Sequence, residues 1–325
     1  MTLRGITNKQ TAQLDVRERL FISRRELLRL ALGAGILISG GAAMGAANSS
    51  QSIFTKAIPR TGESLPMIGL GTWQTFDVGS AQSERAPLRE VLREFVRLGT
   101  VIDSSPMYGR SESVVGDLAA ELKLEGKLFV ATKVWTSGRE AGIRQMEESF
   151  RRLRVKRIDL MQIHNLVDWR THLTTLREWK KQGRIRYIGV THYTASAYDQ
   201  LARVLETEEL DFVQLNYSIV EREAEQRLLP LAADRGVAVL VNRPFAQAQL
   251  FSKVRGKPLP AFAAKIGCTS WAQFFLKFVV SHPAVTCAIP ATSKVQHLAD
   301  NMQAGMGQLP AAEIRQRMVE YVADL

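Results

Sequence analysis

The sequence contains few cysteines and histidines, and each scarcity excludes a class of protein. Its 325 residues include only two cysteines, too few for a small fold that depends on disulfides. The five histidines form no His-x-x-x-His pair, so no catalytic metal is expected. No Gly-x-Gly-x-x-Gly segment opens a helix after an early strand. That absence argues against a Rossmann fold.

The two cysteines, Cys268 and Cys287, leave two possibilities open. They are either buried thiols in a late helix and a late strand, or a disulfide pair formed in an oxidising compartment. Their spacing does not decide between the two, because a disulfide depends on geometry rather than on separation along the chain.

The composition indicates a globular protein with a mild excess of positive charge. Hydrophobic residues make up 46% of the chain and charged residues 23%, which excludes a disordered chain and a collagen-like repeat. The 43 lysines and arginines exceed the 32 acidic residues, an excess that suits an anionic cofactor. The basic run at residues 151–157 lacks aromatic stacking residues and suits the end of a helix. No nucleic-acid partner is therefore predicted.

The first fifty residues resemble an export signal. Arg24 and Arg25 precede an uncharged stretch at residues 30–47 that is rich in alanine and glycine and ends in small residues. This order is typical of a secretory signal, and the paired arginines indicate the twin-arginine route. We predict residues 1–50 to be signal and linker, cleaved near Ala47. The twin-arginine export machinery is then a partner, and the mature protein is periplasmic.

Two other interpretations of this segment remain open. One is an amphipathic helix with an accidental arginine pair. The other is a permanent membrane anchor, although the glycines of residues 30–47 make a poor span, so no stable span is expected.

From residue 51 to residue 325 short apolar runs alternate with amphipathic segments. The candidate strands cover residues 67–70, 100–103, 128–134, 158–163, 187–191, 212–215, 237–241 and 285–289. Helices are expected between them, for example over residues 141–153, 173–182 and 271–280. Strands that are apolar on both faces are typical of a covered parallel sheet. Eight such units predict a (β/α)8 TIM barrel. A small β-hairpin is expected around residues 59–63, and a long loop over residues 245–260 after strand seven.

Polar side chains follow the second, third and fourth of these strands. Asp103 ends the second strand, Tyr108 lies in the loop after it, Lys133 ends the third, and His164 ends the fourth. Because the carboxyl ends of barrel strands share one rim, these side chains should meet there.

Their chemistry suits the reduction of a carbonyl group. Hydride transfer to the carbonyl carbon leaves negative charge on oxygen, which needs a proton donor. A tyrosine becomes a better acid when an ammonium lowers its pKa. Lys133 would supply that charge, Asp103 would hold Lys133, and His164 would orient the substrate oxygen. The hydride itself has to come from a cofactor.

These residues resemble the tetrad of the aldo-keto reductase family, in the pattern Asp-x-x-x-x-Tyr-Gly followed by Thr-Lys and then His. Residues 69–73 (Gly-Leu-Gly-Thr-Trp) resemble its opening strand, and residues 289–294 (Ile-Pro-Ala-Thr-Ser-Lys) its terminal nucleotide-binding segment. The resemblance extends over about residues 53–306. It implies an NADP-dependent oxidoreductase that reduces a small aldehyde or ketone, with Tyr108 as the acid.

The resemblance also implies which residues hold the dinucleotide. Thr191, His192 and Gln214 would contact the nicotinamide carboxamide, and Asp300 and Asn301 the adenine. The other implied contacts are Gly71, Thr72, Asn242, Arg243, Thr292, Ser293 and Lys294.

This chain departs from the family pattern at three places. Asn242 stands where an aromatic residue usually stacks on nicotinamide, and His192 replaces an asparagine. Ala291 and His297 stand where a lysine and an arginine usually grip the 2′-phosphate, so Lys294 or Arg243 would have to do so. NADP is expected, with NAD open. A nucleotide-binding sensor, like the channel-associated subunits of the family, is the alternative to an enzyme.

Overall fold

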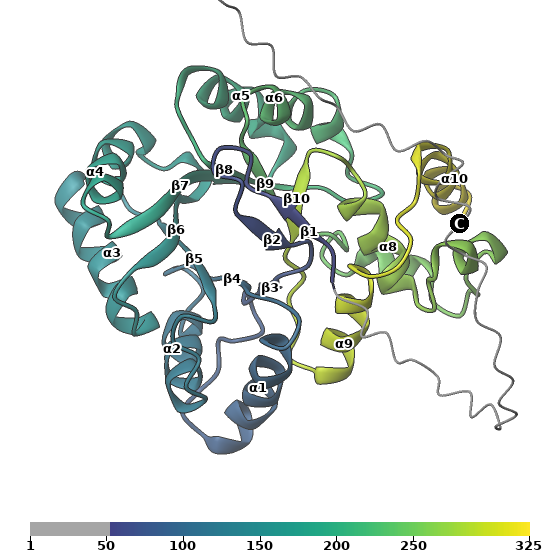
Figure 1. Ribbon diagram of the computed structural model, residues 1–325, viewed down its shortest axis with the longest axis horizontal. Helices are drawn as coiled ribbons and strands as arrows, with labels where there is room; N and C mark the ends of the chain where they lie inside the picture. The colour runs from purple at the N-terminus through teal and green to yellow at the C-terminus, as the bar shows by residue number, and fades with distance from the viewer. Residues whose placement is uncertain (1–52) are drawn as a thin grey trace, which may run out of the picture. The chain divides into compact units, whose positions relative to one another are not determined.

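The computed structural model describes residues 53–325, and the predicted export signal lies outside the described residues. Eight parallel strands surround a central axis, with helices outside them (Figure 1). The strands are β3 (Leu70–Gly71), β4 (Val101–Asp103), β5 (Phe129–Val134), β6 (Ile158–Ile163), β7 (Ile185–His192), β8 (Phe212–Asn216), β9 (Ala238–Asn242) and β10 (Val285–Ala288).

The sheet is ordered as the chain runs, from β3 to β10. Isolated bridges pair Ile68 with Ala288 and Gly71 with Ala291, and they bring the first strand beside the last. Gly71 permits this approach, because a Cβ there would lie 2.7 Å from the carbonyl oxygen of Ile289. The predicted (β/α)8 barrel is therefore confirmed.

The helices lie outside the barrel strands, and most of them are amphipathic. They are α1 (Gln82–Phe95), α2 (Ser111–Glu121), α3 (Arg139–Leu153), α4 (Trp169–Lys181), α5 (Tyr198–Thr207), α6 (Leu228–Asp234), α7 (Gln249–Lys253), α8 (Trp271–Val280), α9 (Val295–Gln303) and α10 (Ala312–Ala323). Helix α4 shows how the sequence ends such a helix. Lys180 and Lys181 occupy its last turn, and Gly183 follows with φ of 74°, a conformation that favours glycine.

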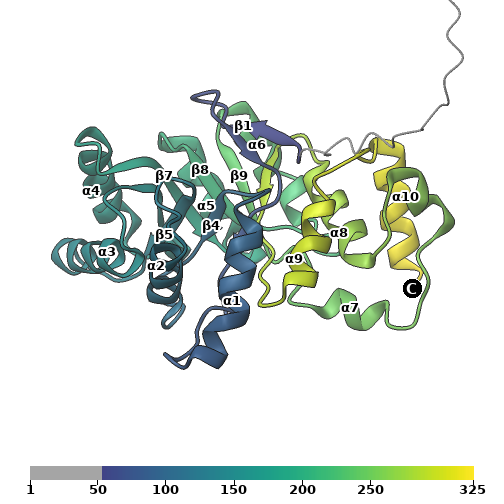
Figure 2. The ribbon, with the colours of Figure 1, turned by 60° about the horizontal axis from the view of Figure 1, so that its bottom comes forward.

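The predicted hairpin is also confirmed. Strands β1 (Thr55–Ala57) and β2 (Ser64–Pro66) pair antiparallel across the amino-terminal end of the barrel (Figures 1 and 2). Ile58 and Leu65 of this hairpin pack with buried side chains from the starts of the barrel strands, among them Phe129 and Phe212. The hairpin thus closes this end, which leaves the carboxyl ends of the strands as the accessible mouth.

The structure refines several of the expected boundaries, most of them by one residue. Strand β3 begins at Leu70 rather than at residue 67, and β7 begins two residues earlier than expected and ends one later. The predicted loop over residues 245–260 contains the short helix α7. Cys268 and Cys287 are both buried free thiols. Within residues 53–325, no helix combines the length and the apolar character that crossing a bilayer requires.

Candidate active site

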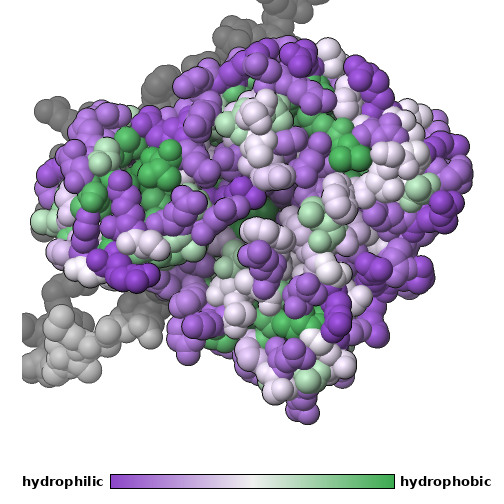
Figure 3. Space-filling model, turned by 180° about the vertical axis from the view of Figure 1, so that it is seen from behind, coloured by the Kyte–Doolittle hydropathy of each residue, from purple (hydrophilic) through white to green (hydrophobic). Residues whose placement is uncertain are grey.

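The four predicted catalytic residues meet at the mouth of the barrel. Seen from the side opposite the hairpin, this face is hollowed near its centre (Figure 3). Asp103 is the last residue of β4, and Lys133 lies next to the end of β5. The Lys133 ammonium donates to Asp103 Oδ2 at 2.7 Å and to the carbonyl oxygen of Ser104 at 2.7 Å. Both charged side chains are fully buried.

Two glutamines complete the surroundings of Asp103. Gln162 on β6 and Gln214 on β8 donate from Nε2 to Asp103 Oδ1 at 3.2 and 2.9 Å. A buried ion pair is stable only when its remaining lone pairs are satisfied, and these amides provide that satisfaction. Gln214, which the resemblance assigns to the nicotinamide carboxamide, donates here to the carboxylate instead.

Lys133 keeps its positive charge in this setting. Burial by itself would lower its pKa, but the Asp103 carboxylate and Tyr108 more than compensate, so the pKa of Lys133 is raised above its ordinary value. The ammonium lies 5.0 Å from the centroid of the Tyr108 ring. The tetrad therefore carries a permanent cation beside the phenol.

The acidity of Tyr108 differs from the simplest expectation. Burial raises its pKa, the Lys133 charge lowers it, and the Asp103 charge raises it again. The net pKa lies above the ordinary value, because desolvation outweighs the ammonium. Tyr108 is consequently a protonated phenol over the physiological pH range. The Lys133 ammonium reduces the rise in the pKa of Tyr108 but does not reverse it.

His164 is a neutral imidazole. Burial lowers its pKa to about 2, and the charges of Lys133 and His192 contribute to the shift. Its Nδ1 lies 3.0 Å from Ser105 Oγ, which also accepts from the Met107 amide at 3.3 Å. Because Ser105 Oγ accepts from that amide, its own proton is free to point to Nδ1. The imidazole proton is then on Nε2, where it can be donated to a substrate.

The backbone around this mouth is locally strained. Ten non-glycine residues between 53 and 325 have positive φ, and eight of them lie in loops that follow barrel strands. They are Gln74, Asn165, Leu166, Asp168, Arg243, Ala246, Gln247 and Ala248. Strain of this kind gathers where side chains are held for function, and here it marks the loops after β3, β6 and β9.

Two buried acceptors at the mouth suit the amide of a nicotinamide. Asn165 Oδ1, after β6, and Asn242 Oδ1, at the end of β9, are buried without a hydrogen-bond partner in the described part of the chain. Orphaned acceptors are costly, and a carboxamide N–H would satisfy them. Thr191 Oγ1 accepts from the Asn165 amide at 3.3 Å, and the His192 ring stacks on Tyr193 at 5.8 Å. The donor and acceptor set therefore fits a dinucleotide.

The predicted phosphate and adenine contacts lie after β10. Thr292 Oγ1 accepts from the Lys294 amide at 3.1 Å, in the turn that contains Ser293 and leads into α9. Exposed Lys294 precedes that helix, whose positive amino-terminal end favours an anion. Asn301 is buried in α9.

Two of the residues expected at the cofactor have partners within the protein. Asp300 accepts from Ser270 Oγ at 2.7 Å and from Gln273 Nε2 at 2.6 Å, which ties α9 to α8. The hydroxyl of Thr72 is buried and donates toward the carbonyl oxygen of Asp103 at 3.0 Å. Both side chains support the site's framework in this structure.

Sequence reasoning missed several side chains of the mouth. Gln162 could have been found, since it lies on β6 two residues before His164, the residue that directly follows this strand, and side chains two residues apart along an extended chain face the same way. Ser105 could not, because its role depends on the conformation of the loop after β4. Exposed aromatic side chains also surround the mouth, namely Trp73 after β3, Trp135 after β5 and Tyr193 after β7.

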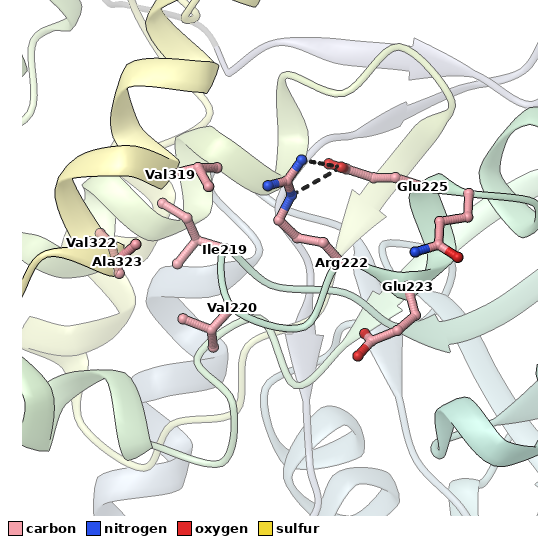
Figure 4. A pocket seen from close by; sticks show the side chains of 9 residues that line it. Ile219, Val220, Arg222, Glu223, Glu225, Val319, Val322 and Ala323 are labelled. Atoms are coloured by element: carbon pink, nitrogen blue, oxygen red, sulfur yellow. Dashed lines mark hydrogen bonds and ion pairs between the residues drawn. The ribbon is translucent and has the colours of Figure 1, made fainter.

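Other hollows in the described residues lie away from the tetrad. One, about 630 Å³, lies between the loop after β8 and α10, where Arg222 pairs with Glu225 (Figure 4). Another, about 740 Å³, is lined by hairpin residues and the starts of strands, including Leu65 and Phe129. Neither contains a tetrad residue. Within residues 53–325 no cluster of three or more potential metal ligands occurs either.

A parallel barrel that buries an Asp–Lys pair beside a tyrosine and a histidine at its carboxyl-terminal mouth defines an acid–base enzyme site. The model of the aldo/keto reductase family matches residues 67–318. The chain belongs to this family.

Similar proteins agree with this assignment. Methylglyoxal reductase YeaE of Escherichia coli (strain K12) is 30% identical over 259 residues, which are 77% of this chain and 89% of the relative. An NADH-specific methylglyoxal reductase of the same organism is 31% identical over 246 residues, 64% of this chain and 73% of the relative. The crystal structure of an aldo/keto reductase from Klebsiella pneumoniae in complex with NADP and acetate has a TM-score of 0.66 at 25% identity. It covers 80% of this chain and 93% of that one.

Proposed function

We propose that this protein reduces an aldehyde or ketone to an alcohol with NADPH. The observation that carries the proposal is the fully buried Lys133–Asp103 pair, 2.7 Å apart, beside the Tyr108 ring. A protein that only bound a nucleotide would have no need for a desolvated cation next to a phenol. The arrangement has a clear use in proton transfer to a developing alkoxide.

The residues divide the chemistry between them. A bound NADPH would supply the hydride for the carbonyl carbon and would be oxidised to NADP⁺. Tyr108 donates its hydroxyl proton to the carbonyl oxygen and becomes a phenolate, which the Lys133 ammonium stabilises until solvent returns the proton. His164 donates from Nε2 to the same oxygen and fixes its position. Asp103 keeps Lys133 protonated and in place.

NADPH is proposed ahead of NADH on two grounds. After the last barrel strand, the exposed Lys294 stands at the amino-terminal end of α9. A lysine and a helix amino terminus together are suited to bind the additional 2′-phosphate of NADPH. The Klebsiella structure was solved with NADP, although one relative is named as NADH-specific. Small dicarbonyls such as methylglyoxal are the first substrates to try, because two of the relatives are named for that activity.

Multiple turnover distinguishes an enzyme from a sensor. The purified protein should oxidise many equivalents of NADPH in the presence of methylglyoxal or of an aromatic aldehyde. The fall in the absorbance of the reduced nicotinamide measures this turnover. Consumption that stopped at one equivalent per chain, across a panel of aldehydes and ketones, would favour the sensor.

We also propose that the protein is exported by the twin-arginine route. The sequence of residues 1–50 supports this proposal, and those residues lie outside the described part of the chain. In a Gram-negative bacterial host, the full chain should accumulate in the periplasmic fraction in a form shortened near Ala47. The Arg24→Lys/Arg25→Lys variant should stay in the cytoplasm at full length. Equal periplasmic amounts of the two would refute the proposal.

A further inference from the structure

Arg243 occupies an unusual place at the barrel mouth. It follows β9 directly, has φ of 50° and is half-buried. Its guanidinium carbon lies 4.4 Å from the centroid of the Tyr193 ring and 5.9 Å from that of the Trp73 ring. These two aromatics follow β7 and β3, so the arginine lies between side chains from different parts of the rim. Such stacking holds the guanidinium plane in a fixed orientation.

The charge of Arg243 has no carboxylate partner in the described part of the chain. The ion pairs of residues 53–325 do not include it. With the side-chain amide of Gln247 oriented so that its oxygen faces the guanidinium, both terminal nitrogens of Arg243 donate to that oxygen, at 3.0 and 2.9 Å. A guanidinium has five N–H donors, so this contact leaves most of them available. Aromatic rings lie beside the guanidinium. Because Gln247 accepts from both terminal nitrogens, the open edge is the one formed by Nε and one terminal nitrogen, which can bind a carboxylate through two parallel hydrogen bonds.

Arg243 also acts on the reacting end of the site. Its positive charge is one of the influences that lower the pKa of Tyr108. The guanidinium also contacts Trp73 and Tyr193, which lie at the same mouth as Tyr108, whereas Lys294 lies in the segment between β10 and α9. Exposed aromatic surface from Trp135, which is 42% exposed, and from Tyr193, which is 40% exposed, is available for the body of a substrate.

We propose that Arg243 binds an anionic group of the substrate, so that the enzyme prefers carbonyl compounds that carry a carboxylate over their neutral counterparts. This inference rests on the proposed reductase function and adds the substrate class. In the bound complex the carbonyl oxygen lies against Tyr108 and His164, while the carboxylate meets the open edge of the Arg243 guanidinium.

The test compares acids with their neutral amides. We would measure kcat/KM with NADPH for 4-carboxybenzaldehyde and 4-formylbenzamide, and for succinic semialdehyde and its amide. The wild-type protein should prefer the acid in at least one pair. In Arg243→Gln that preference should fall by about 10- to 100-fold, the range expected for the loss of a charge-assisted hydrogen bond. Arg255→Gln, at an exposed position in the same loop, is the matched control and should keep the preference.

Binding measurements separate the possible failures. Calorimetric titration of 4-carboxybenzaldehyde into the NADP⁺ complex, which cannot reduce it, reports anion binding without turnover, and Arg243→Gln should weaken it by the same factor. A wild-type enzyme that reduces the amides as well as the acids leaves the reductase function standing and overturns this inference. An unchanged preference in Arg243→Gln, with a weaker Kd for NADPH, would instead assign the arginine to the cofactor. If no carbonyl is reduced, the proposed function fails, and the titration still decides whether Arg243 binds the carboxylate.

Discussion

Replacing Tyr108 with phenylalanine is expected to lower kcat for carbonyl reduction by about 10²- to 10⁴-fold, the usual contribution of a positioned general acid. The ring would keep its contacts with His164, whose centroid lies 5.9 Å away, so the shape of the mouth should not change. Only the proton would be missing. The Kd of NADPH, measured by fluorescence titration, should stay within about twofold, because none of the proposed cofactor contacts involves this hydroxyl.

The raised pKa of Tyr108 also predicts how the rates of reduction and of the reverse oxidation depend on pH. Because burial raises the pKa of Tyr108 despite the Lys133 charge, the phenol stays protonated up to alkaline pH. Reduction by the wild-type protein should therefore show no loss from Tyr108 between pH 6 and 9. Oxidation of the corresponding alcohol needs the phenolate and should rise with pH over the same range. His164 adds no ionisation there, since its pKa of about 2 keeps it neutral.

Tyr321→Phe is the matched control for this substitution. Tyr321 lies in α10 and packs on Trp271, away from the tetrad, so the same loss of a hydroxyl should leave kcat unaltered. Wild-type turnover in Tyr108→Phe would show that another group donates the proton. If the rate of reduction fell with rising pH near neutrality in both the wild-type protein and Tyr321→Phe, the pKa of Tyr108 would be lower than its surroundings indicate.

The barrel could be predicted from the sequence because its signals are local. Each strand is a short, largely apolar run, and some helices carry a stop signal, as Lys181 and Gly183 do for α4. Strand order then follows from chain order in a parallel barrel. The boundaries of β3 and β7 were less accurate. Strand β3 is only two residues long, and isolated bridges, rather than a regular ladder, join its segment to that of β10.

The tetrad could also be predicted, because three of its members end neighbouring strands and a barrel places strand ends on one rim. What the sequence did not provide was the balance of opposing electrostatic effects. The proximity of Lys133 suggested a lowered pKa for Tyr108, whereas desolvation raises it. That balance depends on how many atoms surround the phenol, which no spacing of residues encodes.

The cofactor contacts depend on loops, and loops were predicted least well. Thr72, Asp300 and Gln214 are residue types that could bind a ligand, but their hydrogen bonds go to Asp103, Ser270 and other protein groups. Arg243, which contacts Tyr193 and Trp73, lies in a loop after β9 where several non-glycine residues have positive φ. Such conformations have little sequence signature outside glycine and asparagine. Tertiary packing alone imposes them.

Replacing Lys133 with methionine should affect both activity and stability. Turnover should fall by about 10²-fold or more, because the phenolate formed from Tyr108 would lose its adjacent cation. Stability should fall by about 3–5 kcal/mol, the usual cost of leaving one member of a buried ion pair uncompensated. Asp103 would retain only the amide donors of Gln162 and Gln214. Urea denaturation measures the stability change, and steady-state kinetics at low temperature measures the activity of the folded fraction.

A double variant separates the two effects. In Asp103→Asn/Lys133→Met neither member of the buried ion pair remains, and the asparagine side-chain oxygen can still accept from both glutamines. Much of the lost stability should therefore return, since well-packed neutral groups often replace a buried ion pair at little cost. Activity should not return, because stability requires only charge balance whereas proton transfer requires the ammonium. Recovery of turnover together with stability would mean that Lys133 serves the fold alone, and the proton-transfer role assigned to it would have to be withdrawn.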